Sequence, residues 1–356
     1  MGAWAHLLDF GTTAAERGIP VLQMIHDYSL LCLRNWLVNS DNRTCSGPVS
    51  ASGCYACVEH GISRRARLIA ALVAPVSISF ASLPWCRSGR VLPVQREQIV
   101  ARAFEHMRRY RESVSLYLAQ APENIEVMVR AGHPRSKFRL VPQFIGEDKL
   151  RRYPRAPGRP GKERPLVFVY VGRWSPEKGS ADLVTAFHQA SFPIATELRL
   201  ILSNPQMCGY AEIAGNSPEQ TGQKCLVVYK GLTGAKVSEA LAQSDLCIVP
   251  SRCMEVGSRV VLEAHAQGVP VVCSNTVGNR YLISDGKNGR VYPAADVTAL
   301  KACLEEVACH PALLDDWSRH LTMPVNRAGW KSIVLRIVEE VVGASRCKAP
   351  IPQTLG

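Results

Sequence analysis

Five short apolar runs alternate with helical patterns in the second half of the chain, and this alternation constrains the fold more than any other feature. The runs are Leu166 to Val171, Leu198 to Leu202, Cys225 to Tyr229, Leu246 to Val249 and Val269 to Cys273. Their almost unbroken apolar character is typical of strands buried on both faces of a parallel sheet. Helical patterns lie between them at 181–190, 235–243 and 258–267. The sequence therefore predicts a doubly wound α/β domain.

The first half of the chain shows similar elements in a less regular order. A helical pattern covers residues 4–17, and strand patterns cover 21–26, 114–118 and 138–141. These elements are those of a second Rossmann-like domain that has fewer strands. We therefore expect an N-terminal domain that is incomplete.

Domain boundaries follow from the composition. Residues 151–165 combine Pro and Gly with charged side chains, which is typical of a linker. The sequence predicts an N-terminal domain over residues 1–150, this linker, and a second Rossmann-like domain over 166–323. A C-terminal helix and tail are expected over 324–356, where apolar residues recur at helical spacing.

Composition limits the class of protein. A chain of 356 residues with 47% hydrophobic content can bury two cores. Several of its 13 cysteines lie inside apolar runs, where a reduced thiol packs as a small hydrophobic group. No signal-peptide pattern opens the sequence, and the longest apolar stretch, residues 69–85, is interrupted by Pro and Ser. We therefore expect a cytoplasmic protein without a membrane span.

The net charge of +12 lies almost entirely in the first half, because residues 1–165 hold 24 Lys and Arg against 13 Asp and Glu. Four of the arginines fall on one expected helix: Arg102, Arg108, Arg109 and Arg111. Such a surface favours an anionic membrane or a phosphorylated acceptor, so peripheral association with the inner face of the membrane is one expectation. A solvated basic face without a partner is the alternative. Nucleic acid is not expected, since no binding motif accompanies the charge.

A loop motif, Gly172-Arg173-Trp174-Ser175-Pro176-Glu177-Lys178-Gly179, follows the first strand of the second domain. Ligands of doubly wound sheets bind beyond the carboxyl ends of the strands. Arg173 and Lys178 are therefore placed to stabilise the charge of a departing diphosphate. A surface turn whose cations face water is the alternative.

Two glutamates, Glu255 and Glu263, lie eight positions apart around the start of the helix expected at 258–267. Eight helical steps of about 100° bring two side chains within about 80° of each other. Gly257 allows the backbone to approach a ligand closely, and a helix N-terminus favours an anionic group. Together with Arg173 and Lys178, these carboxylates suit a nucleoside diphosphate sugar, because a carboxylate can accept hydrogen bonds from ribose hydroxyls.

These motifs resemble the donor-binding domain of the retaining glycosyltransferases of family 4, which have the GT-B architecture of two Rossmann-like domains. The resemblance covers Leu166 to about Ala308. It includes Lys230-Gly231-Leu232, Val261-Leu262-Glu263-Ala264, Gly268-Val269-Pro270 and Asp285-Gly286-Lys287-Asn288-Gly289.

The resemblance implies a role for each matched residue. Arg173 and Lys178 would bind the donor diphosphate, Glu263 the ribose and Glu255 the transferred sugar. Backbone amides near Arg259 and Val260 would complete the phosphate cradle. No catalytic cofactor is implied.

Two departures from the family pattern lie close to this cradle. Ser258 stands where the family usually has Gly, and Val277-Gly278-Asn279-Arg280-Tyr281 lacks the family's acidic residue after a Gly-Gly pair. In the first half, His26 and Asp27 at a strand end resemble the family's His-Asp, where the histidine lies beside the donor sugar. A hydrogen-bonding or proton-handling role is expected for His26, and a structural histidine is the alternative.

Four cysteines follow that strand: Cys32, Cys45, Cys54 and Cys57. Four thiolates could hold a structural zinc, and the last pair has the Cys-x2-Cys spacing of such sites. Because the outer spacings are irregular, unliganded reduced cysteines or a redox-sensitive pair remain the alternative.

The sequence as a whole favours a retaining, hexosyltransferase-type enzyme that uses a nucleoside diphosphate sugar and a carbohydrate or lipid-linked acceptor. The early strands of the family's N-terminal domain have no counterpart, so a fragment or a partner chain that completes this domain is expected. An inactive nucleotide-sugar-binding relic is the rival hypothesis. A pyridoxal-dependent phosphorylase is a third, although no lysine site for that cofactor is recognisable.

Overall fold

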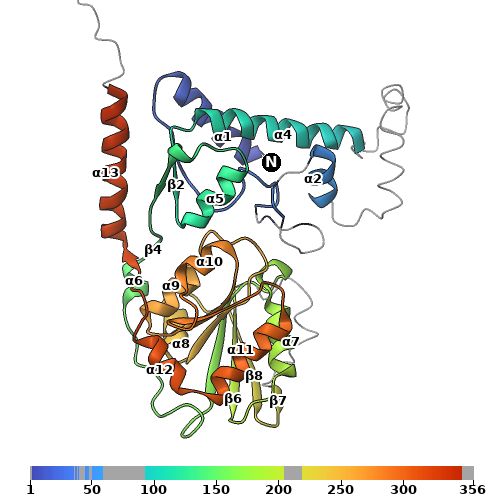
Figure 1. The fold of residues 1–356 in the computed structure, drawn as a ribbon, viewed down its shortest axis with the longest axis vertical. Helices are drawn as coiled ribbons and strands as arrows, with labels where there is room; N and C mark the ends of the chain where they lie inside the picture. Colours follow the sequence, from blue (N-terminus) through green and yellow to red (C-terminus); the bar gives the residue numbers. More distant parts are fainter. Residues whose placement is uncertain are drawn as a thin grey trace, which may run out of the picture. The chain divides into compact units, whose positions relative to one another are not determined.

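The computed structural model describes residues 2–35, 37, 39, 45–47, 50–58, 93–203 and 219–346 (Figure 1). The chain divides into two compact units. The first comprises residues 1–118 and 127–139, and the second comprises residues 119–126 and 140–356.

The second unit is built on a seven-stranded sheet, in the order β11-β10-β9-β5-β6-β8-β7. Every neighbouring pair is parallel except β7 and β8, which are antiparallel. The strands are β5 (Leu166–Gly172), β6 (Thr196–Leu202), β7 (Glu219–Thr221), β8 (Lys224–Lys230), β9 (Leu246–Val249), β10 (Val271–Ser274) and β11 (Gly289–Tyr292).

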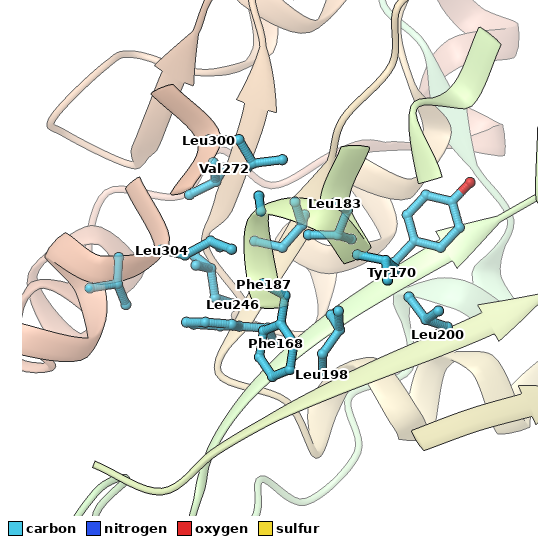
Figure 2. Close-up of a cluster of buried hydrophobic side chains, with 14 of the residues drawn as sticks. Phe168, Tyr170, Leu183, Phe187, Leu198, Leu200, Leu246, Val272, Leu300 and Leu304 are labelled. Atoms are coloured by element: carbon cyan, nitrogen blue, oxygen red, sulfur yellow. The ribbon is translucent and has the colours of Figure 1, made fainter. Parts of the chain in front are cut away.

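Helices cover both faces of this sheet. They are α7 (Ser180–Gln189), α8 (Ala235–Ala242), α9 (Arg259–Ala266), α10 (Val277–Leu282), α11 (Val297–Cys309) and α12 (Ala312–Ser318). One hydrophobic cluster joins Phe168 and Leu246 of the sheet to α7, α11 and α12 (Figure 2). A second cluster joins Val169 and Cys247 to α8 and α9. Successive strand residues enter opposite clusters, because side chains alternate across a sheet.

All five strands predicted from apolar runs are present, and so are the three helices expected between them. The prediction of a parallel sheet is correct apart from β7. Neither β7 nor β11 was expected, because each is short and lacks a continuous apolar run.

The segment predicted to be a linker, residues 151–165, lies within the second unit and packs at the amino ends of the strands. Arg164 donates from Nη1 and Nη2 to the two carboxylate oxygens of Asp245, each over 2.7 Å. Asp245 is only 2% exposed and also accepts from the Val167 amide at 2.9 Å. A buried carboxylate needs such a full set of donors, and here they fix the start of β5 beside the start of β9.

The second unit also contains β4 (Phe144–Ile145), α6 (Glu147–Leu150), β12 (Val325–Asn326) and the long C-terminal helix α13 (Arg327–Arg346). β4 pairs in parallel with β12. The rings of Phe144 and Trp330 lie 4.8 Å apart, so an aromatic contact ties α13 to β4.

The first unit contains a three-stranded sheet in the order β1 (Leu22–Met24), β2 (Leu116–Ala119) and β3 (Phe138–Leu140). Its helices include α1 (Gly2–Glu16), α2 (Ala51–Val58) and α4 (Pro93–Ser113), while α5 (Pro122–Arg130) follows β2. Both α1 and α2 pack against α4. Gly11 permits the close approach of α1, because a Cβ there would lie 2.3 Å from the Tyr110 ring.

Within the described ranges, none of the helices combines the length and the apolar character needed to cross a membrane.

Candidate functional site at the β5–β9 switch point

The strand order places a topological switch between β5 and β9. From β5 the chain proceeds to β6 and β8 on one side, then crosses to β9, β10 and β11 on the other. Connections leave the two central strands in opposite directions, which opens a crevice at their carboxyl ends. The loops at 173–179 and 250–258 flank this point.

An ion pair joins these two loops. Lys178 Nζ lies 2.6 Å from Glu255 Oε1, and Ser251 Oγ donates to the same oxygen over 2.7 Å. Glu255 is 7% exposed, so its charge depends on these donors. Burial is the largest influence on the pKa of Lys178 and acts to lower it, but Glu255 and Cys253 together raise the pKa above its ordinary value. Lys178 is therefore held as a cation.

Backbone contacts lock the two loops together. The carbonyl of Glu177 accepts from the amides of Arg252, at 2.9 Å, and Cys253, at 3.1 Å. Gly179 has a φ of 65°, and a Cβ there would lie 1.9 Å from the Pro250 carbonyl oxygen. The conformation and the space thus both require glycine, which explains the Lys178-Gly179 dipeptide.

A second ion pair anchors the β9 loop to α7. Arg252 donates from Nε and Nη2 to the two oxygens of Asp182, over 2.6 and 2.5 Å. Hydrogen bonding to Asp182 raises the pKa of Arg252. Neither residue could be recognised from the sequence, since only the neighbouring positions of β5 and β9 bring them together. The loop after β9 is thus bonded both to the loop after β5 and to α7.

Arg173 lies at the end of β5, with its side chain 42% exposed and 3.2 Å from Glu177. Its carbonyl accepts from the hydroxyl of Tyr170 over 2.5 Å. Burial raises the pKa of Tyr170, the Glu255 charge raises it further, and the Arg173 charge opposes both. Arg173 and Glu255 therefore both lie close enough to this buried hydroxyl to influence its pKa.

The turn before α9 is held by residues of α10, the helix that follows β10. Ser258, the N-cap of α9, donates its amide to Asn279 Oδ1 over 3.1 Å, and Asn279 is fully buried. Gly278 donates its amide to the Glu255 carbonyl over 2.8 Å. A Cβ on Gly278 would lie 2.1 Å from the Val256 carbonyl oxygen, so this contact also requires glycine.

The two departures from the family pattern are therefore bonded to each other. Ser258 supplies the donor and Asn279 the acceptor of one buried hydrogen bond. Gln143 contacts the same turn, since its Nε2 donates to the Gly257 carbonyl over 2.8 Å. The two departures are visible in the sequence, but a bond between residues 21 positions apart depends on the fold.

The first residues of α9 lie next to this turn. Arg259 is exposed and Val260 is partly buried. The first amides of a helix have no acceptor within the helix, and they carry the positive end of its dipole. The role expected for the amides near Arg259 and Val260, binding the donor diphosphate, stays a prediction.

Glu263 takes a different partner from Glu255. It lies on α9 with 15% of its side chain exposed, and Lys149 Nζ of α6 is 3.7 Å away. Lys149 also donates to the Gly234 carbonyl, just before α8, over 3.1 Å. The two glutamates of the motif thus sit in separate ion pairs, one toward β5 and one toward α6 and α8.

His26 lies in the first unit, directly after β1, and its side chain is exposed. The neighbouring Asp27 accepts from the Ser29 amide over 2.9 Å, which shapes the turn that follows the strand. The strand end expected for His26 is thus present, and its role stays a prediction.

The expected structural zinc is not supported. Cys32 and Cys45 lie on loops, Cys54 and Cys57 lie on α2, and all four are free thiols. In the part of the chain that the structure describes, no three His, Cys, Asp or Glu side chains are arranged to hold a metal ion. Burial raises the pKa of Cys32, which disfavours the thiolate that zinc requires.

Comparison with known proteins identifies the second unit. Residues 165–310 match the model of the family described as glycosyl transferases group 1. The chain carries a glycosyltransferase group 1 domain. The match spans β5 to α11 and therefore includes both loops at the switch point.

Curated relatives also match part of the chain. An alpha-maltose-1-phosphate synthase of Mycolicibacterium smegmatis is 32% identical over 148 residues, which is 40% of this chain and 37% of that protein. A GDP-mannose-dependent alpha-(1-6)-phosphatidylinositol monomannoside mannosyltransferase of the same organism is 25% identical over 59% of this chain and 57% of its own length. The chain thus spans about half the length of these relatives.

The solved structures include a sucrose-phosphate synthase from Thermosynechococcus elongatus with a TM-score of 0.52 and 21% identity. The match covers 76% of this chain and 66% of that one. At this identity the likeness concerns the fold. The expected α/β fold of GT-B type is confirmed.

The Lys178–Glu255 pair should show a strong energetic coupling. Lys178→Met and Glu255→Gln should each lower the free energy of unfolding by about 1–3 kcal/mol, because each leaves a buried partner unsatisfied. The double variant should lose at least about 1 kcal/mol less than the two single losses combined. Urea titration measures the free energy of unfolding of the unmodified protein, the two single variants and the double variant.

Lys301 and Glu305, 3.2 Å apart on α11, provide a surface pair for the same cycle. The coupling energy between Lys301 and Glu305 should be about 0.5 kcal/mol or less. Strictly additive effects at Lys178 and Glu255 would show that their contact does not hold the loops together.

The Asn279 side chain should protect the Ser258 amide. In Asn279→Ala, hydrogen exchange at this amide should quicken about tenfold or more, because the buried donor loses its acceptor. Exchange followed by NMR gives the rate at each residue. Asn288→Ala is the matched control, since Asn288 is also buried and accepts from the Ser284 amide over 2.8 Å. Asn288→Ala should quicken exchange at the Ser284 amide only. Equal effects of both variants on the Ser258 amide would show that Asn279 is not its acceptor.

Proposed function

We propose that the chain is a retaining glycosyltransferase that moves a hexose-type sugar from a nucleoside diphosphate sugar to an acceptor hydroxyl. The observation that carries this proposal is the Lys178–Glu255 pair at the switch point of a glycosyltransferase group 1 domain. This pair places a fixed cation and a buried carboxylate a few residues before the start of α9, at the carboxyl ends of the strands.

The diphosphate would lie against Lys178, Arg173 and the first amides of α9. Charge grows on the diphosphate as the sugar–oxygen bond breaks, so cations fixed before the reaction stabilise the transition state more than the ground state. The contacts between the two loops support this, because they hold the Lys178 backbone against the β9 loop without a ligand.

The sugar would lie near Glu255, and the ribose near Glu263. Both assignments rest on the family resemblance and on the placement of the two residues before and within α9. Buried Glu255 is fixed by Lys178 and Ser251, so it can orient a sugar hydroxyl with little loss of side-chain entropy. His26 is proposed to assist from the first unit.

The reaction balances without a cofactor. The bond from the anomeric carbon to the diphosphate breaks, and a bond from that carbon to the acceptor oxygen forms on the same face. The acceptor hydroxyl gives its proton to the departing diphosphate oxygen. Lys178 and Arg173 stabilise the negative charge that remains on the diphosphate.

A carbohydrate or lipid-linked acceptor is the proposed second substrate. The excess charge of residues 1–165 supports an anionic acceptor or the cytoplasmic membrane surface. On α4, however, Arg108 is paired with Glu105 and Glu112, and Arg111 donates to the Ala131 carbonyl. The helix therefore offers less unpaired charge than the sequence indicates.

Turnover and binding test this function separately. With UDP- and GDP-sugars, Lys178→Ala should lower kcat/KM of transfer or donor hydrolysis by about 100-fold or more, because the leaving group loses its cation. Glu263→Ala should mainly raise KM, because it removes a ribose contact. Lys301→Ala, a change of the same type on α11, should leave both parameters unchanged.

Three outcomes separate the hypotheses. Turnover that survives Lys178→Ala and Glu263→Ala unchanged would contradict the proposed site. Nucleotide binding by calorimetry without turnover over a panel of acceptors would favour the inactive relic, or a subunit that needs a partner chain. An absorbance band of a pyridoxal aldimine would favour the phosphorylase.

A further inference from the structure

A cavity of about 1000 Å³ lies in the second unit, at the amino ends of the strands of its sheet. It is lined by the linker at residues 155–164, by Pro193 and Ile194 before β6, and by the end of α11 with most of α12. The lining includes Asp245, the residue before β9, which shows that the cavity lies at the amino ends of the strands. The cavity is therefore separate from the switch point, which lies at their carboxyl ends.

Basic side chains outnumber acidic ones in its lining. The cations are Arg155, Arg159, Lys162 and Arg164, and the carboxylates are Asp245 and Asp315. Asp245 is already neutralised, because both of its oxygens bond Arg164 and it is almost completely buried. Asp245 also lies 3.9 Å from Arg155 Nη2, so its charge is shared between these two arginines and not with Arg159 or Lys162.

Arg159 and Lys162 are the cations that remain for a ligand. Both are exposed, and neither side chain forms an ion pair with a residue that the structure describes. They lie on one tight turn, because the Arg159 carbonyl accepts from the amides of Lys162 at 3.2 Å and Glu163 at 3.0 Å. Glu163 is the nearest further carboxylate, and its Oε2 accepts from the Arg159 amide over 3.0 Å.

The turn is held in place rather than loose. Gly161 donates its amide to the Arg164 carbonyl over 2.8 Å, and Arg164 is fixed by Asp245. Arg155 is fixed on the other side, since its Nη1 donates to the Gly268 carbonyl over 2.6 Å. Two cations on a fixed turn can bind an anion with a smaller loss of conformational entropy than two on a flexible segment.

The rest of the lining is apolar. Ala156, Pro193, Ile194, Ala308 and Leu314 contribute hydrocarbon surface beside the basic turn. Pockets of this volume accommodate small organic molecules, and Arg and Lys together recognise phosphate oxygens. The chemistry thus matches a molecule that has a phosphate group and an apolar or ring portion.

We propose that this cavity is a binding site for a small phosphate-bearing molecule, held by Arg159 and Lys162 at the amino edge of the sheet. It is independent of the donor site proposed above and does not require that the chain be an active transferase.

Calorimetric titration with inorganic pyrophosphate tests the site in the full-length protein. Arg159→Ala/Lys162→Ala should weaken one binding event at least tenfold. Both side chains are exposed and make no contact that folding requires, so the thermal midpoint without ligand should stay unchanged. Arg173→Ala, which alters the switch point, should leave this binding event intact.

Lys331→Ala/Arg336→Ala removes the same charge from exposed positions of α13 and is the matched control. It should bind pyrophosphate as the unmodified protein does. Unchanged binding by Arg159→Ala/Lys162→Ala would overturn the proposal. So would equal weakening by the control pair, or the absence of any binding at millimolar pyrophosphate.

Discussion

The ion pair between Lys178 and Glu255 is the contact on which the rest of the site depends. It joins the loop after β5 to the loop after β9, and it satisfies a carboxylate that is 7% exposed. The Glu177 carbonyl and the Arg252–Asp182 pair hold the same loops from either side. The cation is thus positioned by the fold itself, which is the condition for electrostatic stabilisation of a leaving group.

Packing on both faces of the sheet makes that arrangement possible. Phe168 and Val169 are neighbours in β5, yet they enter separate hydrophobic clusters. Each central strand is therefore buried from two sides and its carboxyl end cannot shift independently. At the amino ends of the strands, the buried carboxylate of Asp245 holds residues 151–165 against the sheet. It does so because a charge removed from water must be surrounded by hydrogen-bond donors, here Arg164 and the Val167 amide.

Much of the second unit could be predicted from the sequence, because buried parallel strands leave continuous apolar runs. The motif residues Lys178 and Glu255 were also identified, and the structure brings them into contact. The Ser258–Asn279 and Arg252–Asp182 bonds could not be predicted, since they depend on which strands become neighbours. The zinc prediction is not supported among the described residues, and a Cys-x2-Cys spacing indicates two ligands on one segment but not where the others lie.

A crystal structure with a bound nucleoside diphosphate would test the central claim most directly. If the account is correct, the diphosphate oxygens will lie within hydrogen-bonding distance of Lys178 Nζ and of the first amides of α9, while Glu255 remains buried beneath them. A nucleotide bound at the amino edge of the sheet, or anywhere that leaves Lys178 and the start of α9 without contact, would contradict it.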